Sequence, residues 1–576
     1  MSVFFKLLHL IAFLLLSSQL IARTYIDYES PFHPTIGSSG MVVSQNAQSS
    51  SLGVEILDMG GNAVDAAVAV GFSLAITLPR AGNLGGGGFM LIYHKESDKT
   101  FYIDYRSASP LNTNLEILLN QTEPLDFKSL NYINTQEGYL AAATPGTVYG
   151  LLTAHEKFGK LPLEEILQPV IRIAREGILV SQDLHYAISK ASQLKKDPES
   201  KRIYFKNDKP LAINSKMMRP DLANVIEVIA QNGIKGFYSG EIAQKFSDAM
   251  RANKGFIEAN DLKIYEAKIT QPISIEYRGS TIVTSGPPSG GGITLLTALK
   301  ILENFDLKKH KKNSANTYHL LAESLRGGHN NRSHFIGDPA FYDVPLTDLL
   351  SQKRINSLSK KINFKSAVPA AEVKPLEIKN ESRDTTHYSI IDNQGNAVSN
   401  TYTLGSSFGS GVTIPGTGIL LNNQMRNFAY KYGDKSEIGR AASPGNKFEP
   451  GKRPMSTMAP VMVFNDQGNL SLITGSPGGS YIPAAILRIV TGILDFDLNI
   501  GEATMLPRIH KDWPYEGLDY ETVISSDTLI KLKNLGHKPI LNKTIGSTQS
   551  IHVIDGIKYG YADLRRPNAS VSIQID

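Results

Sequence analysis

Two strand-like segments joined by a short turn constrain the fold of this chain more than any other feature of its sequence. Residues 384–391 (DTTHYSII) and 397–404 (AVSNTYTL) are rich in β-branched and aromatic residues, which favour strands. Residues 392–396 (DNQGN) between them are typical of a tight turn. The sequence therefore predicts an antiparallel β-hairpin at this place.

The register of this hairpin brings two threonines together. A turn centred on Gln394 pairs His387 with Thr401 and places Thr385 opposite Thr403. Threonine pairs also stabilise ordinary sheets, by about 0.2–1 kcal/mol, so the pair alone does not identify a site.

The segment before the hairpin indicates a catalytic role for Thr385. Residues 358–383 contain several lysines and few large apolar side chains, which is typical of an exposed linker. A cut between Asp384 and Thr385 would leave a threonine with a free α-amino group. Because such an amine has a pKa near 8, it can take the proton from its own hydroxyl. We therefore predict that Thr385 becomes an N-terminal nucleophile.

A serine motif overlaps the hairpin and offers an alternative nucleophile. Residues 405–409 (GSSFG) match the G-x-S-x-G pattern of a nucleophile elbow. An elbow needs a helix directly after the serine, whereas residues 410–416 (SGVTIPG) have a strand or loop sequence that ends in a helix breaker. The threonine is therefore the preferred nucleophile.

Composition excludes several other classes of function. The chain has no cysteine, so thiolate catalysis, disulfides and cysteine metal sites are excluded. Its 13 histidines show no metal-binding spacing, and we predict no metal and no cofactor. The net charge is only +5, and the one dense basic run, residues 308–312, contains no aromatic residue. That run predicts a solvated loop between helices, and nucleic acid is not an expected partner.

The N-terminus predicts export. Lys6 precedes the apolar run of residues 10–16, and Ala22 is a plausible residue before a cleavage site. We interpret residues 1–22 as a signal peptide, with an uncleaved anchor as the alternative, because the apolar run is short for a membrane span. Export without cysteine suits a bacterial periplasmic or secreted protein.

Hydrophobic periodicity predicts the other elements. They are a helical hairpin over residues 51–78 that is interrupted at 60–62, a β-hairpin made of 89–93 and 101–105, helices over 148–157, 163–176 and 482–494, and a strand pair near 273–283. The glycine run Gly85–Gly88 lacks the following Lys-Ser/Thr of a phosphate-binding loop.

Seven motifs, in order, resemble the γ-glutamyltransferase family of N-terminal nucleophile hydrolases: GGNAVDAAVAVGFSLAITLP, AGNLGGGGFMLIY, IDYRSASP, TTHYSIID, GILLNNQM, GKRPMSTMAP and TGSPGGS. The resemblance extends from about Gly37 to the C-terminus. It implies an α/β fold, a four-layer αββα sandwich. It also implies a precursor that cuts itself into a large subunit (23–384) and a small subunit (385–576), which remain together as a heterodimer. The implied activity moves γ-glutamyl groups from substrates such as glutathione to water or to amino acid and peptide acceptors.

The same resemblance assigns roles to individual residues. Thr385 matches the nucleophile and Thr403 the threonine that assists it, in agreement with the hairpin register. Arg106 matches the arginine that holds the substrate α-carboxylate, to which its planar fork is suited. The remaining matches are Ser456 and Thr457, at a serine pair that binds the same carboxylate, and Gly478 and Gly479, whose N–H groups hold the oxyanion.

Two departures from the family pattern concern the site of the substrate α-amino group. The GILLNNQM motif, which includes Gln424, usually continues with two aspartates, but here it continues with Arg426 and Asn427. The second aspartate pairs with the ammonium group, and losing such a partner costs about 2–5 kcal/mol. The family also usually has Asn where this chain has Gly405. We treat Gly405, Gln424 and Asn427 as substrate-binding positions.

These departures leave alternatives open. The same fold could act on glutaryl or other non-amino acyl amides, as cephalosporin acylases do, or the chain could be a ligand-binding relative that never cleaves. Residues 429–448 are long enough for a lid over the site, although the tyrosine that bacterial members place there, near Ile438, is absent.

Overall fold

The computed structural model describes residues 30–120, 133–369, 384–430, 443–542 and 544–575. The predicted signal peptide therefore lies outside the described residues. Residues from Pro34 to Asp576 form one compact unit. Among the helices of the described ranges, none combines the length and the apolar character needed to cross a membrane.

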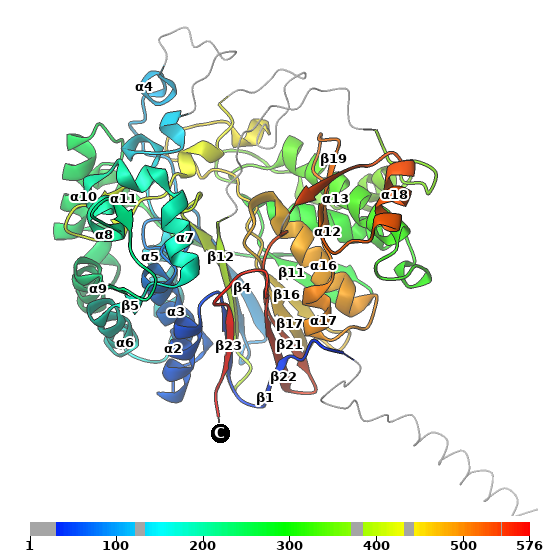
Figure 1. Ribbon diagram of the computed structural model, residues 1–576, viewed down its shortest axis with the longest axis horizontal. Coiled ribbons are helices and arrows are strands. Elements are labelled where there is room, and N and C mark those ends of the chain that lie inside the picture. Colours follow the sequence, from blue (N-terminus) through cyan, green and yellow to red (C-terminus); the bar gives the residue numbers. More distant parts are fainter. Residues whose placement is uncertain (1–29, 121–132, 370–383, 431–442, 543, 576) are drawn as a thin grey trace, which may run out of the picture. The chain divides into compact units, whose positions relative to one another are not determined.

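Two seven-stranded sheets form the centre of this unit (Figure 1). The first has the order β23 (Ser570–Ile573), β2 (Met41–Ser44), β12 (Thr386–Ile391), β13 (Ala397–Thr403), β3 (Gly87–His94), β4 (Lys99–Tyr105) and β9 (Lys268–Thr270). The second has the order β1 (Thr35–Gly37), β22 (Ile557–Ala562), β21 (Gln549–Ile554), β17 (Leu470–Thr474), β16 (Val461–Phe464), β11 (Ser280–Thr284) and β10 (Ile273–Tyr277). All ladders of both sheets are antiparallel.

The inner strands β2 and β3 of the first sheet are buried on both faces, and their alternate residues enter two different cores. Val42, Met90 and Ile92 pack with the helices on one side. Val43 and Leu91 point the other way and pack with the second sheet. This follows from the alternation of side chains along a strand, and it explains why these strands are apolar throughout rather than alternating in polarity.

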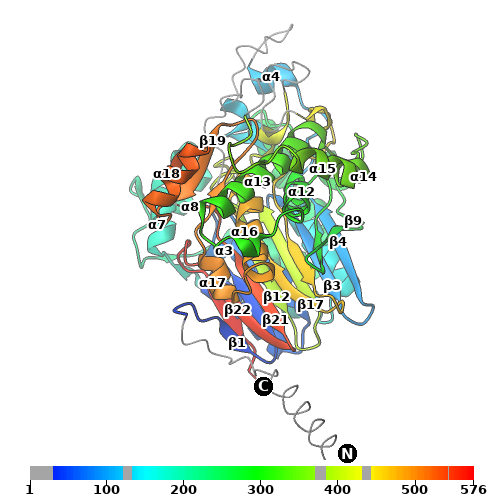
Figure 2. The ribbon, with the colours of Figure 1, turned by 90° about the vertical axis from the view of Figure 1, so that its right-hand side faces the viewer.

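Helices cover the outer faces of the sheets. Those beside the first sheet are α2 (Ala47–Asp58), α3 (Ala63–Thr77), α5 (Thr147–Phe158), α6 (Leu163–Glu176) and α9 (Pro220–Tyr238). Those beside the second sheet are α12 (Gly290–Leu302), α13 (Ala315–Phe335), α16 (Ile482–Leu494) and α17 (Ile500–Met505). Figure 2 looks onto this second side, where α16 and α17 lie in front of the strands. Further elements are α4 (Leu115–Leu119), α7 (Gln182–Lys190), α8 (Pro198–Tyr204), α10 (Gly240–Ala252), α11 (Ala259–Ile264), α14 (Leu346–Leu349), α15 (Gln352–Ser359), α18 (Ser526–Asn534), and a small sheet of β18 (Ile509–His510), β19 (Gly517–Glu521) and β20 (Lys538–Asn542).

The predicted helical hairpin is confirmed as α2 and α3. Asn62 caps α3 by accepting from the N–H of Asp65, whose carboxylate in turn accepts from the N–H of Asn62. This reciprocal capping box explains why the chain restarts a helix directly after the glycines. Every residue of α3 is buried, which accounts for its apolar character on all sides.

The central hairpin, β12 and β13, has the predicted register. His387 pairs with Thr401, and the ladder runs from Thr386–Tyr402 to Ile391–Ala397. Asp392 shapes the turn because its carboxylate accepts from the N–H groups of Gln394 and Asn396. Its second oxygen accepts from the N–H of Ala63, at the first turn of α3, so the turn is fastened to a helix N-terminus.

Other predicted elements are also confirmed, with one correction. Helices α6 and α16 have the predicted bounds, and residues 273–283 form the strand pair β10 and β11. The basic run lies in the connection before α13, where residues 307–309 form a short 3-10 turn. The linker was predicted to begin at Leu358, but α15 continues through Ser359, because Ile355 on this helix is buried. Most residues of 360–369 are exposed, and 370–383 lie outside the described residues.

The serine elbow is excluded. No helix follows Ser407 within residues 408–416, all of which are described, and the short strand β14 (Thr413–Ile414) lies there instead.

Candidate active site

A pocket opens at the end of the central hairpin. It contains eight of the ten residues that the sequence predicts for the site, together with four that it does not. Its lining consists of Arg106, Arg332, Thr385, Thr403, Gly405, Arg426, Asn427, Met455, Ser456, Thr457, Met458 and Gly479. Gln424 and Gly478 are not part of this lining.

The Thr385 and Thr403 hydroxyls lie next to each other, and the Thr403 hydroxyl contacts the carbonyl group of Asp384. Thr385 Oγ1 lies 3.4 Å from Thr403 Oγ1, a long contact for two hydroxyls. The Thr403 hydroxyl donates to the carbonyl oxygen of Asp384 at 3.0 Å and accepts from the N–H of Gly405 at 2.9 Å. In the intact chain, Thr403 thus polarises the carbonyl of the bond that precedes Thr385.

Gly405 adopts a backbone conformation that favours glycine. Its φ is +101°, a conformation that residues with a side chain rarely adopt. A Cβ atom at this position would clash with Asn423 Oδ1, which accepts instead from the N–H of Ser406. An asparagine would not fit here without movement of the backbone.

Gln424 supports the hairpin rather than the pocket. It is fully buried, and its Nε2 donates to the carbonyl oxygen of Thr403 at 2.8 Å. Behind the strand, His387 contacts the hydroxyl groups of Thr401 and Ser389 through its two ring nitrogens. Burial lowers the pKa of His387 to about 3, so its ring is neutral at working pH.

Arg106 lines the pocket with a donor that no described residue uses. The side chain is buried, Nε donates to the carbonyl oxygen of Pro454 at 3.1 Å, and Nη1 has no hydrogen-bond partner among the described residues. Burial lowers its pKa to about 9, although nearby Asp104 opposes this. Asp104 itself pairs with Arg453 at 2.6 Å, so Arg106 has no carboxylate of its own. A buried guanidinium that has an unused donor and no carboxylate partner would be stabilised by an anionic ligand.

Ser456 and Thr457 line the pocket beside Arg106. They lie on the segment that follows Pro454, and the N–H of Ser456 donates to the carbonyl oxygen of Pro288 at 3.0 Å. This bond fixes the segment against the loop before α12.

The N–H groups predicted to hold the oxyanion lie at the start of a helix. Gly479 lines the pocket and opens a 3-10 turn, Gly479–Tyr481, which leads directly into α16. N–H groups at such a start have no partner within the helix and can hold a developing negative charge. Gly478 precedes this turn with a φ of +136° and does not itself reach the lining.

Sequence reasoning missed Arg332 and Arg426, and with them the charge of the pocket. Among the described residues, three arginines line it and no aspartate or glutamate does. Arg426 Nη1 donates to Ser406 Oγ at 2.6 Å. Arg426 stands in the GILLNNQM continuation and could have been recognised there. Arg332 lies on α13, and no local signal in the sequence shows that it faces the pocket.

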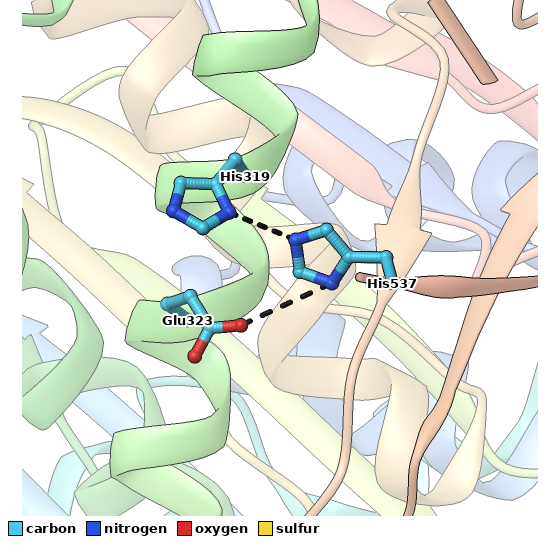
Figure 3. Close-up of side chains that lie close together, drawn as sticks. All are labelled: His319, Glu323 and His537. Atoms are coloured by element: carbon cyan, nitrogen blue, oxygen red, sulfur yellow. Dashed lines mark hydrogen bonds and ion pairs between the residues drawn. The ribbon is translucent and has the colours of Figure 1, made fainter. Parts of the chain in front are cut away.

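One group of potential metal ligands lies apart from the pocket. His319 and Glu323 lie one turn apart on α13, and His537 follows α18 (Figure 3). Lys511 Nζ lies 3.0 Å from His537 Nδ1, His537 Nε2 lies 2.8 Å from His319 Nδ1, and His319 Nε2 lies 3.0 Å from the carbonyl oxygen of Asn363.

The chemistry of the two ends fixes the direction of this chain of bonds. Because Lys511 donates and a carbonyl accepts, His537 and His319 each accept at Nδ1 and donate at Nε2. We call Lys511, His537 and His319 the histidine relay. All four ring nitrogens are used, so none is left to bind a metal. Burial and the charge of Lys511 lower the pKa of His537 to about 2.

A second group consists of His329, His510 and Asp512. Asp512 Oδ1 lies 3.2 Å from His329 Nδ1 and also accepts from the N–H of Trp513 at 2.8 Å. This oxygen is therefore already engaged by two groups of the protein.

Comparison with known proteins adds independent information. The family model described as gamma-glutamyltranspeptidase matches residues 49–573. A glutathione hydrolase proenzyme of Escherichia coli (strain K12) is 42% identical over 93% of this chain and 92% of its own length. An acylase ACY 1 proenzyme of Pseudomonas sp. (strain SE83) is 32% identical over 95% and 96%. A cephalosporin acylase from Bacillus halodurans has a TM-score of 0.83 with 24% identity, covering 97% of this chain and all of that one, and shows the shared fold.

Proposed function

The chain belongs to the γ-glutamyltranspeptidase family, and from that premise we propose that it is a glutathione hydrolase proenzyme that cleaves itself before Thr385. The observation that carries the proposal is that the Thr385 hydroxyl lies next to the Thr403 hydroxyl, which contacts the Asp384 carbonyl. The mature enzyme then transfers γ-glutamyl groups to water or to an amino acid or peptide acceptor.

Self-cleavage begins at Thr385 Oγ1. The hydroxyl attacks the carbonyl carbon of Asp384, the C–N bond breaks, and the nitrogen of Thr385 leaves as an amine while an ester forms. Water hydrolyses this ester, which leaves a carboxylate on Asp384 and restores the hydroxyl. The bond from Thr403 to the carbonyl oxygen supports this step, because it stabilises negative charge on that oxygen.

Turnover repeats this chemistry on a substrate. The free amine of Thr385 takes the proton from its hydroxyl, which attacks the carbonyl carbon of the γ-glutamyl amide. The C–N bond breaks, the leaving amine takes up that proton, and an acyl-enzyme ester remains. Water or an acceptor amine then attacks this ester, which releases the acyl group and restores the Thr385 hydroxyl. Arg106, Ser456 and Thr457 hold the α-carboxylate, and the N–H groups of Gly478 and Gly479 receive the oxyanion. The unused donor of Arg106 supports the first of these roles.

The remaining assignments follow from the same family. We infer an αββα sandwich of the N-terminal nucleophile hydrolase type, supported by the two sheets in contact and by the helices outside them. Fragments 23–384 and 385–576 form the mature heterodimer. Residues 1–22 direct the protein to the periplasm or the exterior, so the large fragment should begin at Arg23.

A second candidate substrate class is favoured by one observation. Within the part of the chain that the structure describes, the pocket lining has three arginines and no acidic residue, and Asn427 carries no charge to pair with an ammonium group. An acyl group that has the carboxylate but lacks the ammonium, such as glutaryl, would bind in such a pocket with little loss of affinity relative to a γ-glutamyl group. Rates on γ-glutamyl and glutaryl anilides, measured side by side, decide between the two classes.

N-terminal sequencing and turnover of a hydroxyl-deletion variant test the proposal. Purified protein should run as two fragments, with Thr385 at the start of the smaller one, and Thr385→Ala should stay whole and inactive. Thr386→Val is the matched control, because the buried Thr386 hydroxyl makes no hydrogen bond and valine has the same shape. A whole but active Thr385→Ala protein would refute the proposal. A single wild-type band that binds ligand without turnover would instead identify a non-cleaving relative.

A further inference from the structure

The side chain of Asp384, directly before the proposed cleavage point, is held by two arginines. Arg80 Nη1 lies 2.9 Å from Asp384 Oδ1, and Arg566 Nη1 lies 3.4 Å from the same oxygen. Arg80 also pairs with Asp183 at 3.1 Å. Two positive and two negative groups therefore form one neutral cluster, in which the Asp384 and Arg80 side chains are only 19% and 8% exposed.

Segments far apart in the sequence supply this cluster. Arg80 lies in the turn after α3, Asp183 in the first turn of α7, and Arg566 between β22 and β23. Arg80 is also tied to the loop beyond β13, because its carbonyl oxygen accepts from the N–H of Phe408 at 3.0 Å. The residue that holds Asp384 is thus connected through its backbone to the loop that follows Thr403.

Asp384 is consequently fixed at two points. Its carbonyl oxygen accepts from the Thr403 hydroxyl, and its carboxylate accepts from the guanidinium groups. Burial raises the pKa of this carboxylate, but Arg80 and Arg566 more than offset this, and the net shift is downward. The carboxylate is therefore charged and paired at working pH. The peptide carbonyl, held at its own oxygen and through the side chain of the same residue, has little freedom to turn.

We propose that Arg80 and Arg566 are positioning residues for self-cleavage, which hold the Asp384 carbonyl in line for the Thr385 hydroxyl. This inference rests on the proposed function. The two arginines belong to the maturation step alone, because neither lines the pocket and Asp384 forms the end of the other fragment once the bond is cut. Their loss should slow maturation and leave turnover by the mature enzyme intact.

The test compares two rates on the full chain. Wild type, Arg80→Gln, Arg566→Gln and Arg80→Lys are made by cell-free translation, and conversion of precursor to fragments is followed by pulse-chase on denaturing gels. Each variant, once cleaved, is assayed for kcat/KM per heterodimer on a γ-glutamyl anilide. Arg172→Gln is the matched control, since Arg172 forms an exposed pair with Glu55 far from the hairpin in sequence.

We expect Arg80→Gln to slow conversion by about tenfold to a hundredfold, the usual effect of a small misplacement of reacting atoms. Arg566→Gln, with its longer contact, should slow it less, Arg80→Lys should recover part of the rate, and Arg172→Gln should convert as wild type does. Mature kcat/KM should stay within about twofold in all four. In an Asp384→Asn background, Arg80→Gln should cause little further slowing, because its partner is already neutral.

Two results would overturn the inference: unchanged conversion in both Arg80→Gln and Arg566→Gln, or a fall in mature kcat/KM that parallels the slower conversion. If Arg80→Gln does not fold, the Arg566→Gln and Asp384→Asn chains decide in the same way. Wild-type protein that never converts refutes the proposed function itself, which separates the two failures.

Discussion

The pocket around Thr385 and the histidine relay, of which His319 lies on α13, both bury charged and polar groups, but they satisfy them in different ways. In the relay, Lys511, His537 and His319 pass hydrogen bonds in one direction to a carbonyl, and each ring nitrogen has a partner. In the pocket, as far as the described residues show, Arg106 has an unused donor and no acidic side chain is part of the lining.

This difference distinguishes buried polar groups that stabilise the fold from buried polar groups that bind a ligand. A relay that ends on a carbonyl oxygen contributes to stability and leaves no ring nitrogen for a ligand. A pocket with unused cationic donors is costly until an anion arrives, and it therefore marks a binding site. Substitutions in the pocket should therefore alter catalysis, and substitutions in the relay should alter stability.

The largest expected effect is at Arg106. Arg106→Gln removes the cation that we predict binds the substrate carboxylate, and kcat/KM should fall by about a hundredfold to a thousandfold, mainly through KM. Steady-state kinetics on a γ-glutamyl anilide measure this. Stability should change little, because the variant removes a buried charge that has no carboxylate partner.

Arg106→Lys is the control, since it keeps the charge and loses the planar fork. It should recover only part of the lost activity. If Arg106→Gln kept the KM of the wild type, Arg106 would not bind the substrate carboxylate, and the pocket could not be contrasted with the relay as a binding site.

The next largest effect is the loss of stability expected when the histidine relay is broken. His319→Ala leaves the Nε2–H of His537 and the carbonyl oxygen of Asn363 without partners, and it should lower the free energy of unfolding by about 2–3 kcal/mol. Urea unfolding of the uncleaved Thr385→Ala chain measures this without separation of the fragments. His33→Gln, at an exposed histidine, should have no effect.

Kinetics of the cleaved His319→Ala enzyme complete this test. A change in KM as large as the one caused by Arg106→Gln would show that the relay serves the pocket after all.

The relay and the hairpin also predict how stability depends on pH. The pKa of His537 is lowered to about 2 and that of His387 to about 3, both chiefly by burial, whereas unfolded histidines titrate near 6.5. Below pH 6.5 the unfolded chain takes up protons that the folded chain does not. Stability is therefore full above pH 6.5 and falls as the pH is lowered, by about 2 kcal/mol per histidine between pH 6.5 and 5.

Urea unfolding of the Thr385→Ala chain at several pH values checks this dependence. His537→Gln should show a shallower slope, and His33→Gln the wild-type slope. Equal slopes in all three chains would mean that His537 is not the group that titrates.

Local signals predicted the parts of the fold that local chemistry determines. The hairpin register followed from turn residues and alternation, and α6 and α16 followed from apolar periodicity with clear breakers at their ends. The linker boundary was wrong by two residues, because the burial of Ile355 against the rest of the fold extends α15 and is not visible locally.

Tertiary packing determined what the sequence could not reveal. Arg332 reaches the pocket from α13, and the groups around Asp384 come from two loops and the first turn of α7, which meet only in the folded chain. A motif names a residue without showing which way its side chain points. Gln424 therefore matched the substrate motif, although its side chain supports Thr403 from behind.

Asn427 offers the smallest effect and the sharpest test of substrate class. Asn427→Asp restores the acid that the family uses for the substrate ammonium, and it should shift the ratio of γ-glutamyl to glutaryl turnover toward γ-glutamyl by about tenfold. This is less than the full value of a buried charge pair, because Arg426 also lines the pocket and competes for the new carboxylate. Adding Arg426→Gln removes that competitor and should enlarge the shift, whereas Arg426→Gln alone should change the ratio less than Asn427→Asp. If the ratio is the same in wild type, the single variants and the double variant, position 427 does not recognise the ammonium, and the cationic lining of the pocket must select its substrate in another way.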